Sequence, residues 1–271
     1  MIWWLLLPLV FLLWFSHRYG WWMKTVPYQH PRILMYHMVS EPESKHKFKG
    51  LRVSPQAFEQ QVAYLADQGW NFVTMQELMS ASSVPEKTVA ITFDDGYEDN
   101  FTQALPILKK YGAKATLYLV VDRHDRDWSS KKKAHHNSGE LAKETKLSDQ
   151  QVKQMLASGV FELGAHTLTH VNLSKAPAAV KRLEIIGSKE QLEKRFQVEV
   201  NSFAYPFGIY DAQDAKIAQE AGYLSSVTTV DGIDLDLNRD PQQLKRVKVS
   251  GKDNFYAFKL RMRIGRRGVK S

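Results

Sequence analysis

Strand-like and helix-like segments alternate along most of this chain, and this alternation constrains the fold more than any other feature. Short apolar stretches with strand character occur at 32–37, 72–73, 88–93, 115–121, 161–164, 202–205, 224–230 and 247–249. Repeated strand–helix units predict parallel strands joined by right-handed crossovers. About seven such units in roughly 240 residues fit an α/β fold of the (β/α) barrel type, with about seven parallel strands, better than an open sheet.

The helices expected between these strands carry start signals. Ser54-Pro55 places an N-cap residue before a proline at the first helical position. Thr74–Glu77 is a capping box, and Ser148–Gln151 caps another helix. Further helices are expected within 105–112, 176–196 and 211–221. The polar segment 122–146 lacks periodicity and is expected to be a long loop, in which we interpret His135-His136 as a solvated pair rather than a metal site.

Two motifs with reactive side chains each follow one of the predicted strands. Asp94-Asp95-Gly96 follows the strand at 88–93, and His166-Thr167-Leu168-Thr169-His170 follows the strand at 161–164. Either motif alone has an ordinary interpretation, as a turn or as two surface histidines. In a parallel barrel, however, the carboxyl ends of the strands share one rim, so the motifs are expected to converge there. The chain has no cysteine, so any transition-metal site must use His, Asp or Glu side chains. The two motifs together supply two imidazoles and two carboxylates, which is sufficient for a metal site that activates water.

Together these motifs resemble the first two motifs of the polysaccharide deacetylase (NodB-homology) superfamily, the family-four carbohydrate esterases. Tyr205-Pro206-Phe207-Gly208 is similar to the third motif of that family. Tyr36-His37-Met38-Val39 is similar to the Tyr-His-x-Val signature of one branch, which includes the poly-N-acetylglucosamine deacetylases. The resemblance, which spans 33–249, implies a distorted (β/α) barrel of about seven strands. It also implies metal-dependent removal of acetyl groups from N-acetylated or O-acetylated sugars.

The resemblance further implies roles for individual residues. Asp95, His166 and His170 should bind the divalent metal, usually Zn2+. Asp94 should be the general base that takes a proton from water. The oxyanion of the reaction is expected near a backbone N–H close to Phe207, and we place Tyr205 and Pro206 with it on the substrate side.

Two parts of the family pattern are missing from this chain. Many members take their general acid from a histidine near the C-terminus, but no histidine follows His170 here. His37 is the leading substitute, with a buried structural histidine as the alternative. Many relatives also carry an arginine in the third motif that pairs with the base, where this chain has Phe203-Ala204. Arg246 is the candidate replacement, with a surface charge at the start of a strand as the alternative.

Both ends of the chain differ in composition from the predicted deacetylase domain at 25–252. Residues 2–15 are uninterrupted apolar sequence, and we interpret residues 1–24 as an uncleaved membrane anchor, with a buried core helix as the alternative. Residues 253–271 are interpreted as a basic tail that meets a membrane surface rather than nucleic acid. We therefore expect an inner-membrane protein with one N-terminal anchor. Arg18 and Lys24 favour a cytoplasmic catalytic face, and a periplasmic face stays open.

The leading hypothesis is a metal-dependent N-deacetylase whose substrate is an N-acetylhexosamine of the bacterial envelope. Both a polyprenyl-phosphate-linked amino sugar destined for lipid A modification and a poly-N-acetylglucosamine-type polymer fit it. One alternative is a non-catalytic, membrane-tethered glycan-binding protein on a deacetylase barrel, against which the intact Asp94 argues. Another is a non-haem iron oxygenase, which also uses two histidines and a carboxylate, but the close ligand spacing of those enzymes is missing.

Overall fold

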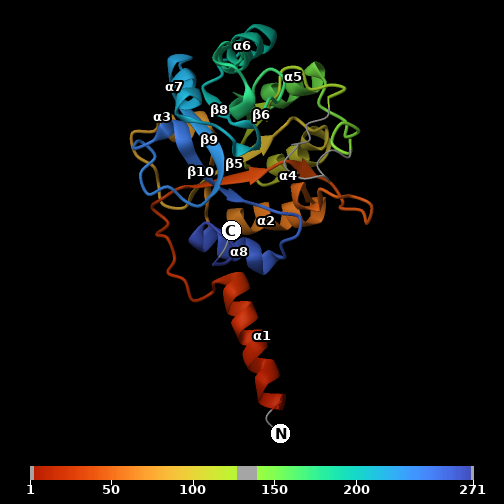
Figure 1. Cartoon of the computed structure of the whole chain (residues 1–271), viewed down its shortest axis with the longest axis vertical. Helices are drawn as coiled ribbons and strands as arrows, with labels where there is room; N and C mark the ends of the chain where they lie inside the picture. Colours follow the sequence, from red (N-terminus) through yellow and green to blue (C-terminus); the bar gives the residue numbers. More distant parts are fainter. Residues whose placement is uncertain (1–2, 127–138, 270–271) are drawn as a thin grey trace.

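Seven parallel strands close into a barrel in the computed structural model, which describes residues 3–126 and 139–269 (Figure 1). The ring runs through β1 (Arg32–Tyr36), β10 (Leu244–Lys248), β9 (Ser225–Asp231), β8 (Ser202–Ala204), β7 (Phe161–Ala165), β6 (Ala115–Leu119) and β5 (Thr88–Asp94). β5 pairs back with β1, and every pairing in the ring is parallel. The predicted barrel of about seven parallel strands is therefore confirmed.

The barrel is distorted at β5, which pairs with three other strands. Its first residues pair with β4 (Asn71–Val73) as well as with β1, and its pairing with β6 begins only at Ile91. β4 therefore extends the sheet outside the ring. A second, separate sheet of two short strands, β2 (Met38–Val39) and β3 (Arg52–Val53), was not predicted. Two residues are too few to show the alternation that identifies a strand in a sequence.

The helices begin where their capping signals predict. Ser54 caps α2 (Pro55–Asp67), and complete capping boxes open α3 (Met75–Ser80) and α5 (Asp149–Ala157). The other helices around the barrel also lie where they were expected: α4 (Leu105–Lys110), α6 (Ala178–Phe196) and α7 (Ala212–Glu220). Within the predicted long loop, His135-His136 falls outside the described residues.

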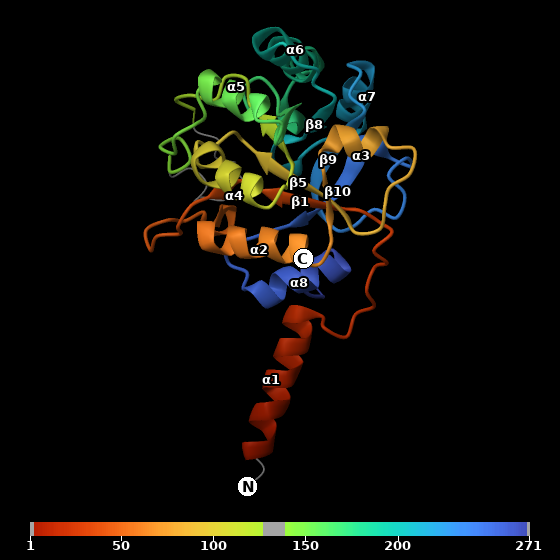
Figure 2. The same cartoon turned by 180° about the vertical axis from the view of Figure 1, so that it is seen from behind.

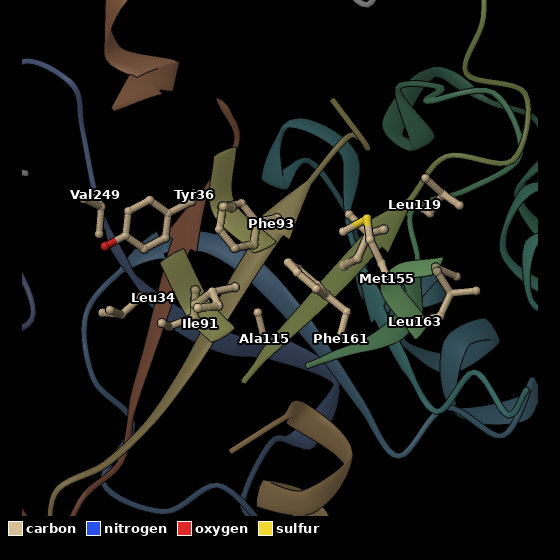
Figure 3. Packing of buried hydrophobic residues seen from close by; sticks show 14 of the residues in the cluster. Leu34, Tyr36, Ile91, Phe93, Ala115, Leu119, Met155, Phe161, Leu163 and Val249 are labelled. Atoms are coloured by element: carbon tan, nitrogen blue, oxygen red, sulfur yellow. The ribbon is translucent and has the colours of Figure 1, made fainter. Parts of the chain in front are cut away.

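Alternation along the strands separates the interior of the barrel from an outer hydrophobic layer. Ile91 and Phe93 of β5 belong to the main hydrophobic cluster, together with Met155 of α5 (Figure 3). Successive residues of a strand point to opposite faces, so Thr92 and Asp94 face the interior. This pattern brings the first carboxylate of the Asp-Asp pair inside the barrel and leaves the second beyond the end of the strand.

The apolar N-terminal segment forms helix α1 (Trp3–Tyr19), which projects away from the barrel (Figures 1 and 2). Every side chain from Leu9 to Trp14 is more than half exposed, so the alternative of a buried core helix is wrong. In the part of the chain that the structure describes, no helix has both the length and the apolar character needed to cross a bilayer.

The basic C-terminal segment folds onto the barrel domain instead of extending as a tail. Helix α8 (Phe255–Ile264) packs beside α2 and buries Phe258 and Leu260. Its Arg261 is also buried and pairs with Asp253. Basic residues interrupt the apolar ones in this segment, so its apolar pattern was not recognised in the sequence.

Candidate active site

Asp94 and Asp95 leave strand β5 in different directions because the chain turns sharply between them. Asp94 is the last residue of the strand, whereas Asp95 and Gly96 have φ angles of 79° and 78°. Gly96 is required here, since a Cβ at this position would lie 2.4 Å from Cδ1 of Leu119. A positive φ at Asp95 costs on the order of 1 kcal/mol, and such strain is typical of residues held in place for function.

The three residues predicted to bind a metal come together after β5 and β7. Oδ1 of Asp95 lies 3.4 Å from Nε2 of His166 and 3.3 Å from Nε2 of His170. All three residues are buried, and their ligand atoms lie within 4.8 Å of one another. Ligands about 2.0–2.1 Å from a tetrahedral zinc ion are themselves roughly 3.3 Å apart, so the donor set and the two Asp95–imidazole distances fit Zn2+ with one position open.

Hydrogen bonds orient the two imidazoles. Nδ1–H of His166 donates to the carbonyl of Ala204 at 2.7 Å, which directs Nε2 toward Asp95. The backbone N–H of His170 donates to the hydroxyl of Thr167, and both residues have positive φ angles, 58° and 66° respectively. The loop between the histidines is therefore a defined turn that aims both Nε2 atoms at one point.

Glu184 of α6 holds this loop from outside the barrel, and no pattern in the sequence points to this residue. Its buried carboxylate accepts the backbone N–H of Thr169 at 2.9 Å and the hydroxyl of Thr169 at 2.6 Å. Thr169 directly precedes His170, so this contact fixes the backbone that carries the second imidazole. A single glutamate within a charged helix looks like a solvated residue until the helix is placed against the loop.

Arg246 reaches Asp94 from β10, which is separated from β5 in the ring by β1 alone. Its Nη1 and Nη2 atoms donate to the two carboxylate oxygens of Asp94, each at 2.7 Å. Nε donates to the carbonyl of Thr228, and Nη1 also donates to the hydroxyl of Thr92. The side chain of Arg246 is completely buried, so the alternative of a surface charge is wrong.

Burial opposes the ionisation of both carboxyl groups, but their partners outweigh it. The charge and hydrogen bonds of Arg246 hold the pKa of Asp94 below its ordinary value. Hydrogen bonds with His166 and His170 hold the pKa of Asp95 well below its ordinary value. Both groups are therefore carboxylates at neutral pH, as a base and a metal ligand must be.

His37 follows β1 and lies on the same rim, as expected. Its Nε2 is 3.9 Å from Oδ2 of Asp94, which is within ion-pairing range but too long for a hydrogen bond. The His37 side chain is 16% exposed, whereas that of Asp94 is 3% exposed. Asn100 donates to the carbonyl of His37 at 2.9 Å and so fixes its backbone. His37 is thus placed where it can meet both Asp94 and a molecule that enters from solvent.

The third motif forms a tight turn whose residues take different positions. Phe207 has a φ of 59°, and its ring packs 4.5 Å from that of His170, measured between ring centroids. Pro206 begins the turn and is buried. Tyr205 is also buried, and its hydroxyl donates to the carbonyl of Gln242 at 3.0 Å. Phe207 therefore lies beside a predicted metal ligand. Tyr205, which was expected on the substrate side, is buried and holds the start of the turn through its hydrogen bond to Gln242.

Sequence comparison identifies relatives over most of the chain. The family model described as polysaccharide deacetylase matches residues 81–225. YxkH of Bacillus subtilis (strain 168), whose name assigns it provisionally as a polysaccharide deacetylase, is 33% identical over 233 residues, which cover 84% of this chain and 75% of YxkH. A poly-β-1,6-N-acetyl-D-glucosamine N-deacetylase of Staphylococcus aureus (strain MRSA252) is 27% identical over 190 residues, which cover 66% of this chain and 61% of the relative.

Two solved structures are similar to this chain over most of its length. The Streptococcus pyogenes deacetylase PplD, in complex with acetate, is similar with a TM-score of 0.69 and 29% identity, covering 84% of this chain and 95% of PplD. BA0330 from Bacillus anthracis, provisionally a polysaccharide deacetylase, has a TM-score of 0.72 and 29% identity, covering 85% of this chain and 68% of BA0330. The family-model match at 81–225 includes β5 and β7, the strands that lead to the aspartate and histidine motifs.

Proposed function

The chain belongs to the polysaccharide deacetylase family, a family of carbohydrate amide hydrolases, and from that premise we propose that it removes acetyl from N-acetylhexosamine units of a bacterial cell-envelope glycan. One observation carries the proposal. The ligand atoms of Asp95, His166 and His170 face a common point, while the neighbouring carboxylate of Asp94 is held by Arg246. Metal ligands and an adjacent base are the two components that hydrolysis of an acetamide requires.

Asp95, His166 and His170 would hold the metal, and Zn2+ fits this donor set best among the common divalent ions. When bound, such an ion lowers the pKa of a coordinated water and polarises the acetyl carbonyl. Asp94 accepts the proton of the attacking water. Arg246 keeps Asp94 ionised and fixed in orientation, and each carboxylate oxygen retains a second lone pair for the proton.

Cleavage of the amide C–N bond requires a proton for the departing sugar amine. We assign this proton to His37, because it lies on the rim near Asp94 and is partly exposed. Replacing His37 with Gln should then lower turnover by about a hundredfold or more while metal binding is retained. An undiminished kcat in that variant would remove His37 from the mechanism.

The polymer substrate is the first to test, since the Staphylococcus aureus relative is named for poly-β-1,6-N-acetyl-D-glucosamine. A lipid-linked N-acetylhexosamine is the second candidate, and the exposed apolar surface of α1 favours it. A non-catalytic glycan-binding protein is disfavoured. Metal binding needs only Asp95 and the two histidines, and the buried Arg246–Asp94 pair carries a desolvation cost that catalysis explains.

The test uses the purified chain with Zn2+ and two substrates, a β-1,6-linked N-acetylglucosamine oligomer and a polyprenyl-phosphate-linked N-acetylhexosamine. We expect acetate release and the loss of one acetyl mass per modified sugar by mass spectrometry. The Asp94→Asn variant is the matched control and should release acetate at least about a hundredfold more slowly. If the metal-loaded chain binds these sugars but never deacetylates either one, the non-catalytic alternative is correct.

A further inference from the structure

Helix α1 is an apolar surface without a protein partner over most of its described length. Leu7, Leu9 and Phe11 are each more than half exposed, and so are the neighbouring side chains on the other sides of the helix. Apolar residues that surround a helix completely cannot be covered by packing one face against a barrel. Exposed Trp14, Trp21 and Trp22 gather where the helix meets the rest of the molecule, and tryptophan is typical of membrane–water interfaces.

The base of α1 is attached to α8 by several contacts. Tyr256 of α8 stacks on Phe15 with 6.2 Å between ring centroids and meets Tyr19 edge-on at 5.5 Å. Backbone hydrogen bonds join Val26 to Arg263 at 2.9 Å and Val269 to His17 at 3.2 Å. These contacts fix the direction of α1 relative to the barrel, so α1 is not a loosely tethered arm.

The segments that meet at this junction are strongly basic. Residues 17–26 and 252–269 contain eight lysines and arginines and a single acidic residue, Asp253. Arg261 and Arg267 neutralise Asp253. Within the described residues, the other six form no ion pair with an acidic side chain; we call them the basic collar, and they are Arg18, Lys24, Lys252, Lys259, Arg263 and Arg266.

We propose that α1 inserts into an anionic lipid surface while the basic collar contacts the phosphate headgroups, so that α1 and α8 together dock the barrel on the membrane in a fixed orientation. Charge decides between lipid and a second copy of this chain as the partner. Two chains paired through α1 side by side would bring two unneutralised collars together, whereas anionic headgroups neutralise them.

This orientation would leave the active site open along the membrane. Strand β1, whose end leads into His37, runs across the direction of α1 in both views (Figures 1 and 2). A glycan lying parallel to the membrane surface could then reach the rim without passing between the barrel and the lipid.

Vesicle flotation of the full chain tests the proposal without using enzyme activity. We expect binding to vesicles of phosphatidylcholine plus phosphatidylglycerol, and much weaker binding to phosphatidylcholine alone. Each basic residue near an anionic surface strengthens binding about fivefold, so the triple variant Lys24→Gln/Lys252→Gln/Arg266→Gln should bind about a hundredfold more weakly. The variant Leu9→Ser/Phe11→Ser/Leu13→Ser should lose binding to both kinds of vesicle.

A matched control removes the same charge from the far end of the molecule. Lys153, Lys194 and Lys216 are exposed on α5, α6 and α7, away from α1 (Figure 1). Their triple change to Gln should leave vesicle binding within about twofold of the parent. Thermal unfolding of each variant separates lost binding from lost folding.

Single-cysteine labels test the orientation, because the chain has no cysteine of its own. A polarity-sensitive dye on Lys252→Cys should shift to the blue with anionic vesicles, and the same dye on Lys194→Cys should not. Equal binding to both lipids, or unchanged binding by the collar variant, would overturn the role of the collar. A chain that stays off vesicles and forms a discrete dimer would show that a second copy covers α1.

Discussion

Asp94 and Asp95 are adjacent residues at the end of β5, yet their carboxylates contact different kinds of side chain. Asp95 faces two imidazoles, which carry no obligatory positive charge. Asp94 faces the guanidinium of Arg246, whose positive charge is permanent. The Asp95 side can therefore accept a cation, whereas on the Asp94 side the position that a cation would take is already filled.

This difference shows how two neighbouring carboxylates acquire separate roles. An ion bound by both aspartates would leave no free base beside it. Arg246 occupies both oxygens of Asp94 and repels a metal from that side, and the left-handed turn at Asp95 carries the second carboxylate toward the histidines. Each substitution below removes one residue that sets the role of Asp94 or of the metal ligands.

The largest effect is expected from Asp95→Ala, which removes the only carboxylate among the clustered ligands of the described site. Zinc affinity, measured by competition with a chelating dye, should fall by more than about a hundredfold, and activity should fall with it. Asp94→Asn is the control and should keep zinc affinity within about threefold. Tight zinc binding by the Asp95 variant would place the ion elsewhere.

Asp94→Asn should separate binding from chemistry. Removing a general base lowers kcat by about 10²–10⁴-fold, whereas zinc affinity should be preserved because Asp94 lies outside the ligand cluster. Steady-state kinetics with a defined zinc content measures both quantities. If this variant loses its zinc, Asp94 is a ligand and the two sides of the site are not distinct.

Arg246→Gln should damage both stability and pH dependence. It leaves Asp94 buried without its cation, which lowers the free energy of unfolding by about 3–5 kcal/mol. Arg246 holds the pKa of Asp94 down, so its removal raises that pKa. The base works as an anion, and the acidic limb of the pH–activity profile should therefore move to higher pH.

The control for Arg246 is Arg239→Gln, since the Arg239 side chain is 83% exposed and lies close to the start of β10. This change should leave the unfolding free energy within about 0.5 kcal/mol of the parent. An Arg246→Gln variant with an unshifted pH profile would mean that the guanidinium supports the fold without setting the ionisation of Asp94.

The smallest effect is expected from Glu184→Gln, which weakens the clamp on Thr169 and keeps the shape of the side chain. Groups that orient metal ligands contribute about 10–100-fold in affinity, and the retained amide oxygen should keep the loss near tenfold. Glu190→Gln, exposed on the same helix, is the matched control. Unchanged zinc affinity in the Glu184 variant would show that the turn holds His170 without help from α6.

Much of the barrel and its ligand cluster could be predicted from the sequence because both depend on short-range signals. Short apolar runs located six strands of the ring, and caps such as Ser54 and Thr74 located helix starts. The seventh strand was predicted at 247–249, but β10 begins at Leu244 and includes Arg246. The position of Asp95 and His166 directly after strands was enough to bring them to one rim, because parallel strands share that rim. Helix α8 was not predicted, because charged residues interrupt its apolar positions.

The sequence by itself determined that parallel strands would bring two histidines and two aspartates to one end of a barrel, because strand periodicity and chain direction are local properties. Only the tertiary structure decided how those groups divide the chemistry. Arg246 reaches Asp94 across 152 residues of sequence, and Glu184 reaches the histidine loop from a helix. Such contacts depend on how the barrel closes and how helices lie against it, and no pattern within a single segment encodes that.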